Sequence, residues 1–315
     1  MHDTIIIGTG PAGMSAAIYA VRAGLSVLCI EQNPMSGGQI VDTYEVDNYP
    51  GIPGINGFDL AMKLREHVDK LGATVKSAEV RGIRRKEADG GDNAPIYIVE
   101  TEKEELETKT VILATGATHA HLGVPGETEL AGKGVSYCAT CDGAFFRGKT
   151  AAVVGGGDVA VEDAIFLARG CEKVYLIHRR DELRAAKILQ DELKALPNVE
   201  VVWDSVVREV LGEDAVTGVL VENVKTGEKK ELASSACFMA VGILPRSGSF
   251  GGLCDMDDKG YIIADESGRT SAPGIFAAGD VRTKRLRQVV TAVADGANAV
   301  TSVTDYLVGR DYSGR

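Results

Sequence analysis

The stretch Thr4-Ile5-Ile6-Ile7-Gly8-Thr9-Gly10-Pro11-Ala12-Gly13 decides the fold, because it joins a short apolar strand to a glycine-rich turn. A helical pattern follows to Arg22, and residues 25–31 form a second strand pattern that ends at Glu31. Glycines let the backbone approach a pyrophosphate, the helix start supplies N–H donors, and the acid can accept hydrogen bonds from ribose hydroxyls. These residues therefore predict a βαβ unit that binds a dinucleotide.

The same pattern begins again in the middle of the chain. Ala151 to Val154 form a buried strand pattern that leads into a second small-residue turn, Gly155 to Ala160. A helical stretch and another strand pattern, Val174 to Ile177, follow in the same order as in the first unit. The chain therefore predicts two nucleotide-binding units.

The two units differ where their second strand ends. The first ends in Glu31, whereas the second ends in His178-Arg179-Arg180, with Arg184 one helical turn further on. An acid there would repel a ribose 2′-phosphate, and arginines would clamp it with charge-assisted, often bidentate hydrogen bonds. We therefore expect the second unit to prefer NADPH over NADH. The alternative is a solvated basic helix start, in which Asp181 and Glu182 pair with these arginines.

Two cysteines lie between the glycine turns. Cys138 and Cys141 are separated by two residues, and such a dithiol tends to have one thiol of lowered pKa and to exchange with other disulfides. Asp142 directly follows and is a candidate proton donor. The same spacing also suits half of a zinc site or two buried thiols, and His119 and His121 are available as further zinc ligands.

Composition limits the class of protein. A length of 315 residues suits about two domains. The chain is 44% hydrophobic and 25% charged, and no run approaches the ~18 apolar residues that a membrane span needs. The net charge of −11 makes nucleic acid and anionic membranes unlikely partners. The N-terminus resembles no secretory signal, so we expect a cytoplasmic protein in which the other four cysteines stay reduced.

The C-terminal part is expected to complete the first domain. Gly274 to Asp280 is a strand and turn that ends in an acid, which suits the far end of a dinucleotide, and Val289 to Leu307 has helical periodicity. The predicted class is α/β, with two Rossmann-like three-layer dinucleotide-binding domains. Residues 1–118 and 246–315 would form a discontinuous first domain, and residues 119–245 the domain inserted into it.

Over essentially its full length the chain resembles the bacterial-type low-molecular-weight thioredoxin reductases, class II of the pyridine nucleotide-disulfide oxidoreductases. The motifs that carry this resemblance are the two glycine turns, Gly37-Gly38-Gln39, Ala114 to Ala117, Cys138 to Gly143, His178 to Asp181, Arg184-Ala185, Gly279-Asp280 and Arg287-Gln288. Leu183 departs from the family, which more often has an aromatic residue nearby, but the arginines expected to bind phosphate are present.

The resemblance implies FAD in the first domain and NADPH in the second, with no metal. The residues implied for FAD are Gly8, Gly10, Pro11, Ala12, Gly13, Glu31, Gln32, Gly38, Gln39, Asn48, Thr115, Gly116, Gly279, Asp280, Arg287, Gln288 and Val289. The residues implied for NADPH are Gly155, Gly157, Asp158, Val159, His178, Arg179, Arg180 and Arg184.

The resemblance also implies a reaction. A hydride would pass from NADPH to FAD, and two electrons would then pass to a Cys138–Cys141 disulfide. Cys141 would face the flavin, Cys138 would attack the disulfide of oxidised thioredoxin, and Asp142 would exchange protons with the dithiol. The nicotinamide and the disulfide must both reach one flavin, so we expect the second domain to rotate about residues 119–125 and 242–246. A homodimer is implied as well.

Other interpretations stay open. The same enzyme could reduce another protein disulfide, such as that of a peroxiredoxin-linked or glutaredoxin-like carrier. A ferredoxin-linked reductase of the same fold would not need the two cysteines, and a zinc-binding or NADPH-sensing regulatory module would need two further ligands near them. One further basic group is expected to be a solvated loop rather than a landing patch for an acidic partner: Arg282, Lys284, Arg285 and Arg287.

Overall fold

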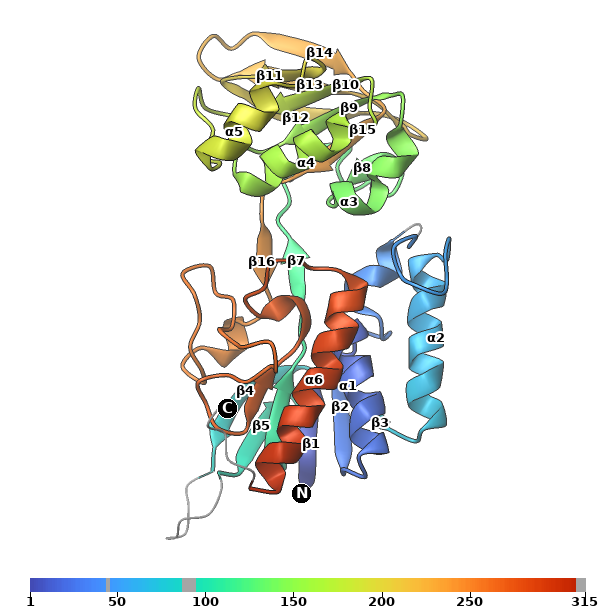
Figure 1. Ribbon diagram of the computed structural model, residues 1–315, viewed down its shortest axis with the longest axis vertical. Coiled ribbons are helices and arrows are strands. Elements are labelled where there is room, and N and C mark those ends of the chain that lie inside the picture. Colours follow the sequence, from blue (N-terminus) through green and yellow to red (C-terminus); the bar gives the residue numbers. More distant parts are fainter. Residues whose placement is uncertain (44–45, 87–94, 310–315) are drawn as a thin grey trace. The chain divides into compact units, whose positions relative to one another are not determined.

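The structure is a computed structural model that describes residues 1–43, 46–86 and 95–309. It divides into two compact units (Figure 1). Met1–Thr118 and Leu244–Arg315 form the first unit, and His119–Ile243 form the inserted unit. The connections between them contain β7 (Ala117–His119) and β16 (Ile243–Pro245), which pair as a two-stranded sheet.

The described part of the first unit has one sheet of seven strands, in the order β3-β2-β1-β6-β5-β4, with β17 paired to β6. The pairs β3-β2, β2-β1, β1-β6 and β6-β17 are parallel, whereas β4, β5 and β6 pair antiparallel. The strands are β1 (His2–Ile7), β2 (Val27–Glu31), β3 (Thr74–Ser77), β4 (Val80–Arg85), β5 (Tyr97–Thr101), β6 (Glu105–Leu113) and β17 (Ile275–Ala277).

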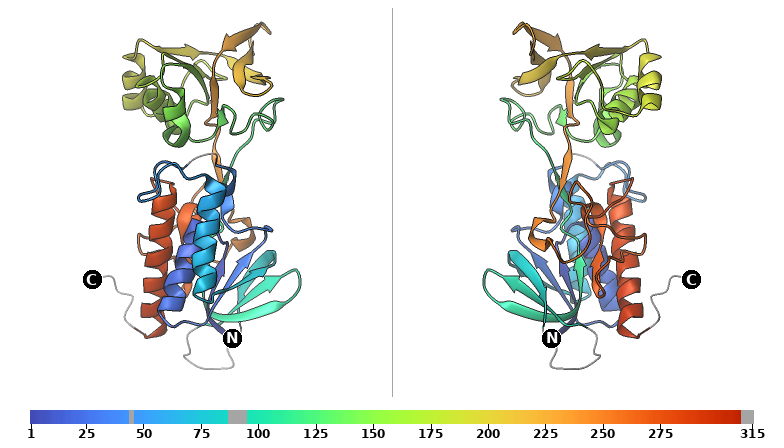
Figure 2. Two further views of the ribbon diagram at one scale, coloured as in Figure 1. Left: turned by 90° about the vertical axis from the view of Figure 1, so that its right-hand side faces the viewer. Right: turned by 90° about the vertical axis from the view of Figure 1, so that its left-hand side faces the viewer.

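Apolar side chains on both faces of the central strands create the layers of this unit, as expected for parallel strands covered on both sides. Ile6 and Ile112 pack with the helices α1, α2 and α6, which lie on one side of the sheet (Figure 2). Ile5 faces the opposite way and packs with Phe250 and Ile262 from the C-terminal segment. The helical segments are α1 (Pro11–Arg22), η1 (Gly38–Asp42), α2 (Gly57–Lys70), η3 (Gly248–Phe250), η4 (Gly279–Val281) and α6 (Val289–Leu307).

The inserted unit has a parallel sheet, in the order β11-β10-β9-β15-β8, and a separate antiparallel sheet, β12-β13-β14. Its strands are β8 (Val135–Ser136), β9 (Thr150–Val154), β10 (Lys173–Ile177), β11 (Val199–Val202), β12 (Ser205–Gly212), β13 (Val216–Asn223), β14 (Lys229–Ala233) and β15 (Ala236–Met239). Its helical segments are α3 (Ala139–Asp142), η2 (Gly143–Phe146), α4 (Asp158–Ala168) and α5 (Lys187–Lys194).

The predicted α/β class with two parallel-sheet units is confirmed. The interruption of the first unit after Thr118 and its return at Leu244 are structural facts, whereas the nucleotide assigned to each unit stays a prediction. Among the described residues, no helix has both the length and the apolar character needed to cross a bilayer.

Candidate functional site

The first glycine turn lies between β1 and α1 and needs its glycines for steric reasons. Gly8 has φ +98°, and a Cβ there would lie 2.4 Å from the Ala114 carbonyl oxygen. A Cβ on Gly13 would lie 1.9 Å from the carbonyl oxygen of Gly8, so the helix starts in direct contact with the turn. The first N–H groups of α1 have no partner within the helix, which makes this end of α1 suited to a pyrophosphate.

Glu31, at the end of β2, is fixed against this turn. Its Oε2 accepts hydrogen bonds from the Thr9 N–H and the Thr9 hydroxyl, both at 2.8 Å. Its Oε1 accepts from the backbone N–H of Asn33 at 2.9 Å. The same Thr9 hydroxyl contacts Ser36 at 2.8 Å, a partner that no sequence motif indicated. The acid therefore lies beside the glycine turn, where a ribose hydroxyl would reach it.

Asp280 joins this site from the other end of the chain. It lies in η4, and a Cβ on the adjacent Gly279 would lie 2.9 Å from Cβ of Ala12, at the start of α1. Oδ1 of Asp280 is buried and has no hydrogen-bond partner among the described residues. Burial raises the pKa of Asp280, and the nearby Lys284 and Arg287 oppose that shift. A buried acceptor without a donor, beside the glycine turn, fits a ligand that carries hydroxyl groups.

The basic group after Asp280 corrects a prediction. The expected solvated loop is wrong for Arg282, whose side chain is only 2% exposed. Arg282 donates from Nε and Nη2 to the two carboxylate oxygens of Asp295, each at 2.9 Å. Lys284 also lies buried, with its Nζ 2.8 Å from Asp295. Of these four residues only Arg285 is exposed. The compensating acid is on α6, so the local sequence of the loop could not show that the loop is buried.

Asp295 also holds the turn that carries Asp280. Its Oδ2 accepts from the Gly279 N–H at 2.9 Å, in addition to its bonds with the two cations. Hydrogen bonds from Arg282 and Lys284 outweigh burial, which alone would raise the pKa of Asp295, and keep that pKa below its ordinary value. The residue was not predicted, because nothing in the helical pattern around it distinguishes a buried charge.

The remaining residues implied for FAD fall into small contact groups. The Asn48 amide donates to the Gln288 side chain at 2.9 Å, although the two residues are far apart in sequence. The Gln39 amide donates to the Ala117 carbonyl, and the Thr115 hydroxyl donates to the Arg246 carbonyl at 2.6 Å.

The other residues implied for FAD lie in or next to the same turns and helix starts. Gly38 has φ +59°, and a Cβ there would lie 3.4 Å from Cα of Gly10. Arg287 lies with its guanidinium carbon 4.2 Å from the centre of the Tyr261 ring. The positions of the others are as follows: Pro11 and Ala12 begin α1, Gln32 is exposed beside Glu31, Gly116 follows Thr115, and Val289 begins α6.

The second glycine turn joins β9 to α4 and is tightly packed. A Cβ on Gly155 would lie 2.5 Å from the Ala240 carbonyl oxygen, and one on Gly156 would lie 2.1 Å from Nδ1 of His178. His178 is buried, and its Nε2 lies 3.0 Å from the Glu182 carbonyl oxygen. The His178 ring therefore packs directly against the backbone of the second glycine turn. A Cβ on Gly157 would meet nothing within 4 Å, so the far side of the turn is open, and Asp158 and Val159 begin α4 there.

The arginines that follow β10 lie in a loop, because α5 begins only at Lys187. The expected helical turn before Arg184 is therefore wrong; its N–H instead donates to the Gly156 carbonyl at 2.7 Å, which folds the loop back onto the glycine turn. Asp181, a proposed partner of the arginines, pairs with Lys225 at 2.9 Å. In the described ranges, Arg179, Arg180 and Arg184 are exposed and form no ion pair.

Cys138 and Cys141 form a disulfide, with their Cα atoms 5.3 Å apart; Cys138 directly precedes the short helix α3, and Cys141 lies within it. Burial raises the pKa of Asp142 above its ordinary value, and a hydrogen bond from Ser136 opposes that shift. The Ser136 hydroxyl donates to Asp142 at 2.6 Å and accepts from the Cys138 N–H at 3.1 Å. Ser136, which sequence reasoning missed, therefore links the carboxyl group to the disulfide.

The other cysteines and the two histidines have different surroundings. Cys29, Cys171 and Cys237 are buried thiols, and Cys254 is partly buried. Among the described residues there is no group of three or more His, Cys, Asp or Glu side chains that could hold a metal ion. His121 instead lies with Nδ1 2.9 Å from the Tyr137 hydroxyl.

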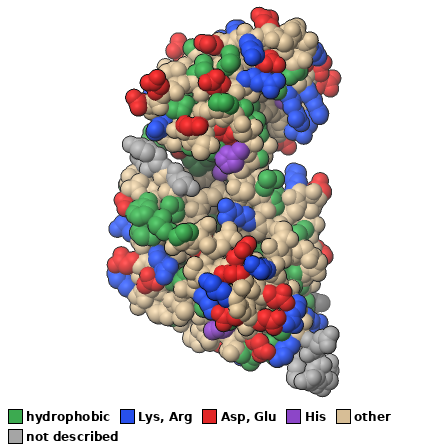
Figure 3. All heavy atoms as spheres, turned by 180° about the vertical axis from the view of Figure 1, so that it is seen from behind, with side chains coloured by type: hydrophobic (Ala, Val, Ile, Leu, Met, Phe, Trp, Pro, Cys, Tyr) green, Lys and Arg blue, Asp and Glu red, His purple; other side chains and the backbone are tan. Residues whose placement is uncertain are grey.

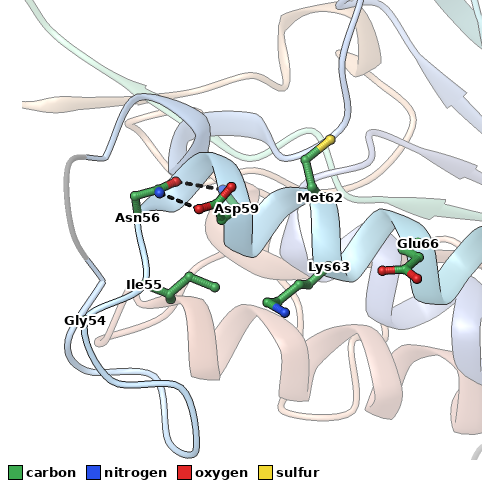
Figure 4. A pocket seen from close by; sticks show the side chains of 7 residues that line it. All are labelled: Gly54, Ile55, Asn56, Asp59, Met62, Lys63 and Glu66. Atoms are coloured by element: carbon green, nitrogen blue, oxygen red, sulfur yellow. Dashed lines mark hydrogen bonds between the residues drawn. The ribbon is translucent and has the colours of Figure 1, made fainter.

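Acidic and basic side chains are interspersed over much of the face shown in Figure 3. Surface pairs such as Arg84 with Glu100 and Arg208 with Glu222 match this distribution. A hollow of about 540 Å³ lies along α2 (Figure 4). It is lined by Gly54, Ile55, Asn56, Asp59, Met62, Lys63 and Glu66, none of which is a predicted site residue.

Comparison with known proteins covers nearly the whole chain. The family model described as "Pyridine nucleotide-disulphide oxidoreductase" matches residues 2–296. The thioredoxin reductase of Bacillus subtilis is 44% identical over 309 residues, covering 98% of this chain and 95% of its own, and that of Peptoclostridium acidaminophilum is 44% identical over 314 residues, covering 98% and 97%. The crystal structure of thioredoxin reductase from Streptococcus pyogenes is 50% identical, covers 98% of this chain and 99% of its own, and has a TM-score of 0.91.

Proposed function

Because this chain belongs to the pyridine nucleotide-disulphide oxidoreductase family, we propose that it is a flavoprotein thioredoxin-disulfide reductase that uses FAD and NADPH. The observation that carries the proposal is the Cys138–Cys141 disulfide, hydrogen-bonded through Ser136 to a carboxyl group of raised pKa. Two glycine turns of different chemistry flank it in the sequence. When bound, FAD and NADPH supply the electron pair that opens this disulfide.

The first unit would hold FAD along the line from Glu31 to Asp280. The N–H groups at the start of α1 would bind the pyrophosphate, and Glu31 would accept from the ribose of the adenosine half. The unpartnered Oδ1 of Asp280 would accept from a hydroxyl of the ribityl chain. Asn48 and Gln288, already hydrogen-bonded to one another, would lie near the flavin ring.

The second unit would hold NADPH at the open side of its glycine turn. The N-terminus of α4 would bind the pyrophosphate, and the exposed Arg179, Arg180 and Arg184 would bind the 2′-phosphate. The loop is held close to the turn by the Arg184 N–H, and Asp181 is occupied by Lys225, so the arginines keep their charge available for a ligand.

The reduced cysteines would carry out a dithiol–disulfide exchange. The Cys138 thiolate attacks one sulfur of the thioredoxin disulfide, which forms a mixed disulfide and releases the other thioredoxin sulfur as a thiolate. The Cys141 thiolate then attacks Cys138, which restores the disulfide of this protein and releases the second thioredoxin sulfur. Asp142 would relay the two thiol protons of the reduced cysteine pair, one at a time, to the two leaving thiolates of thioredoxin, and so end each exchange in its starting state. Thioredoxin is thereby reduced by two electrons, and the cysteine pair is oxidised by two.

Domain rotation follows from where these groups lie in the chain. The arginines and the cysteine pair are both in the inserted unit, whereas the residues proposed for FAD are in the first unit. Only the segments around β7 and β16 join the units. We infer that the inserted unit turns about these connections, so that the nicotinamide and the disulfide approach the flavin alternately. We further propose that the protein acts as a homodimer in the cytoplasm.

Anaerobic titration of the purified protein tests this function. NADPH should bleach the yellow flavin, NADH should do so only at much higher concentration, and oxidised thioredoxin should restore the colour. Replacing Cys138 or Cys141 by Ser should keep the bleaching and abolish the recovery. A protein that binds no flavin would refute the proposal. Recovery with a peroxiredoxin-linked or glutaredoxin-like disulfide, but not with thioredoxin, would assign a different partner.

A further inference from the structure

One buried acid of the inserted unit has no part in either nucleotide site. The Glu127 side chain is 1% exposed. It accepts hydrogen bonds from the backbone N–H groups of Gly123 at 2.7 Å and Leu122 at 3.2 Å. Burial alone would raise the pKa of Glu127, but these bonds and one from Tyr137 bring that pKa below its ordinary value. An ionised carboxylate therefore holds the backbone of residues 122–123, which belong to the first connection between the units.

Tyr137 links Glu127 and the first connection to the segment that contains Cys138. Its hydroxyl donates to Oε1 of Glu127 at 3.0 Å and lies 2.9 Å from Nδ1 of His121. Its ring stacks on the ring of His119, with centroids 4.9 Å apart and planes 21° apart, and meets His121 edge-on at 5.3 Å. His119 is the last residue of β7. One tyrosine thus contacts the connection at two histidines and, through Glu127, at its backbone.

Tyr137 is also the residue between Ser136 and Cys138. Ser136 holds the Cys138 N–H at 3.1 Å and donates to Asp142. The short segment 136–138 is therefore fixed on one side to the carboxyl group that follows the disulfide, and on the other to the connection. A displacement of the connection at residues 119–123 would be transmitted through the Tyr137 side chain to the backbone of Cys138.

We propose that Tyr137 and Glu127 are positioning residues that couple the first connection to Cys138. The inference rests on the proposed function, in which the connection moves between two steps of the reaction. Tyr137 and Glu127 would keep residues 136–138 in one geometry relative to the connection. The position of Cys138 would then change together with the connection when the inserted unit rotates. In this role both residues would act through the backbone of Cys138.

The variant Tyr137→Phe tests the proposal, because it keeps the ring and removes both hydrogen bonds of the hydroxyl. In the prereduced, flavin-free protein we expect iodoacetamide to alkylate Cys138 about threefold faster, since the segment is held less firmly. In the holoenzyme we expect the reduction of thioredoxin disulfide to slow about tenfold, because small misplacements of reacting groups are costly. Flavin bleaching by NADPH should stay within about twofold of wild type, as the second unit's nucleotide site is untouched.

Tyr175→Phe is the matched control. Tyr175 is a partly buried tyrosine of β10 in the same unit, with Lys173 4.5 Å over its ring, and its variant should alkylate at the wild-type rate. Glu127→Gln, which keeps the size of the side chain, is the second variant, for the case that Tyr137→Phe folds poorly. It should also make alkylation of Cys138 faster. Wild-type alkylation in both Tyr137→Phe and Glu127→Gln would overturn the coupling, and so would an equal change in Tyr175→Phe. Alkylation needs neither flavin nor thioredoxin, so this result is separate from failure of the proposed reductase activity.

Discussion

Single buried charges decide much of the chemistry of this protein. Asp295, Glu127 and Asp142 are acids whose surroundings differ in the number of donors they offer. Asp295 and Glu127 are surrounded by donors that lower their pKa, whereas the one donor at Asp142 does not offset burial. The first two are therefore fixed anions, whereas burial lets Asp142 keep its proton to a higher pH than an ordinary aspartate does.

The Asp295→Asn variant should damage the first unit severely. It would leave Arg282 and Lys284 buried without their carboxylate, and breaking such a pair costs about 3–5 kcal/mol. We expect the free energy of unfolding of the flavin-free protein to fall by about that amount in a urea titration followed by circular dichroism. Asp69→Asn, which removes an exposed pair with Arg65 on α2, should cost about 1 kcal/mol or less. Equal losses in the two variants would contradict the assigned role of Asp295.

Asp163 on α4 should make stability depend on pH. Burial raises the pKa of Asp163 from 3.8 to about 7, with a smaller contribution from Glu162. The folded state then holds the proton more tightly than the unfolded state, so this contribution is complete below about pH 4 and is lost as pH rises through 7. Relative to Asp163→Asn, the wild type should lose roughly 3–4 kcal/mol of stability across that range, at about 1.4 kcal/mol per pKa unit. Urea titrations at several pH values would measure it, with Asp191→Asn as an exposed control; parallel curves for wild type and Asp163→Asn would argue against the shift.

At the scale of elements, the glycines of the turn between β1 and α1 have different roles: one is needed for folding, and another mainly for ligand binding. A Cβ on Gly10 would have its nearest neighbour, the Gly37 carbonyl oxygen, at 3.9 Å, whereas one on Gly13 would lie 1.9 Å from the Gly8 carbonyl oxygen. Gly10→Ala should therefore fold normally but bind FAD about tenfold more weakly, a loss of about 1.4 kcal/mol, because the pyrophosphate must approach that position. Gly13→Ala should weaken FAD binding and also lower the melting temperature of the flavin-free protein. Wild-type FAD affinity in Gly10→Ala would place the pyrophosphate elsewhere.

The elements that sequence could predict are those whose signal is local. The helix pattern from Val289 to Leu307 matches α6, and the turn glycines follow from the backbone geometry of a strand that meets a helix. The misses depend on residues brought together from afar. Arg282 looked exposed because its partner Asp295 is on a helix, and Ser36, Ser136 and Tyr137 carry no motif. The loop before α5 looked helical because its polar residues show no periodicity that would distinguish a helix from a loop.

At the scale of the whole molecule, function would depend on the two connections. Locking residues 119–125 and 242–246 with a non-reducible engineered cross-link should leave FAD binding intact and stop steady-state turnover, since only one of the two half-reactions would keep access to the flavin. Single-cysteine variants treated with the same reagent provide the control. Turnover that continues undiminished after complete cross-linking would refute the rotation.

The pairing of β17 with β6 has a consequence for how the chain acquires its structure. Ile275 to Ala277 lie beside Val111 to Leu113, so the central sheet of the first unit gains a strand that leaves the ribosome long after the rest. The inserted unit, in contrast, needs only residues 119–243. During synthesis the inserted unit can therefore finish folding before β17 and α6, the last strand and helix of the first unit, have been made. A truncated chain that ends at Ile243 and has been released from the ribosome should accordingly yield a protease-resistant fragment from the inserted unit alone, with the N-terminal segment digested.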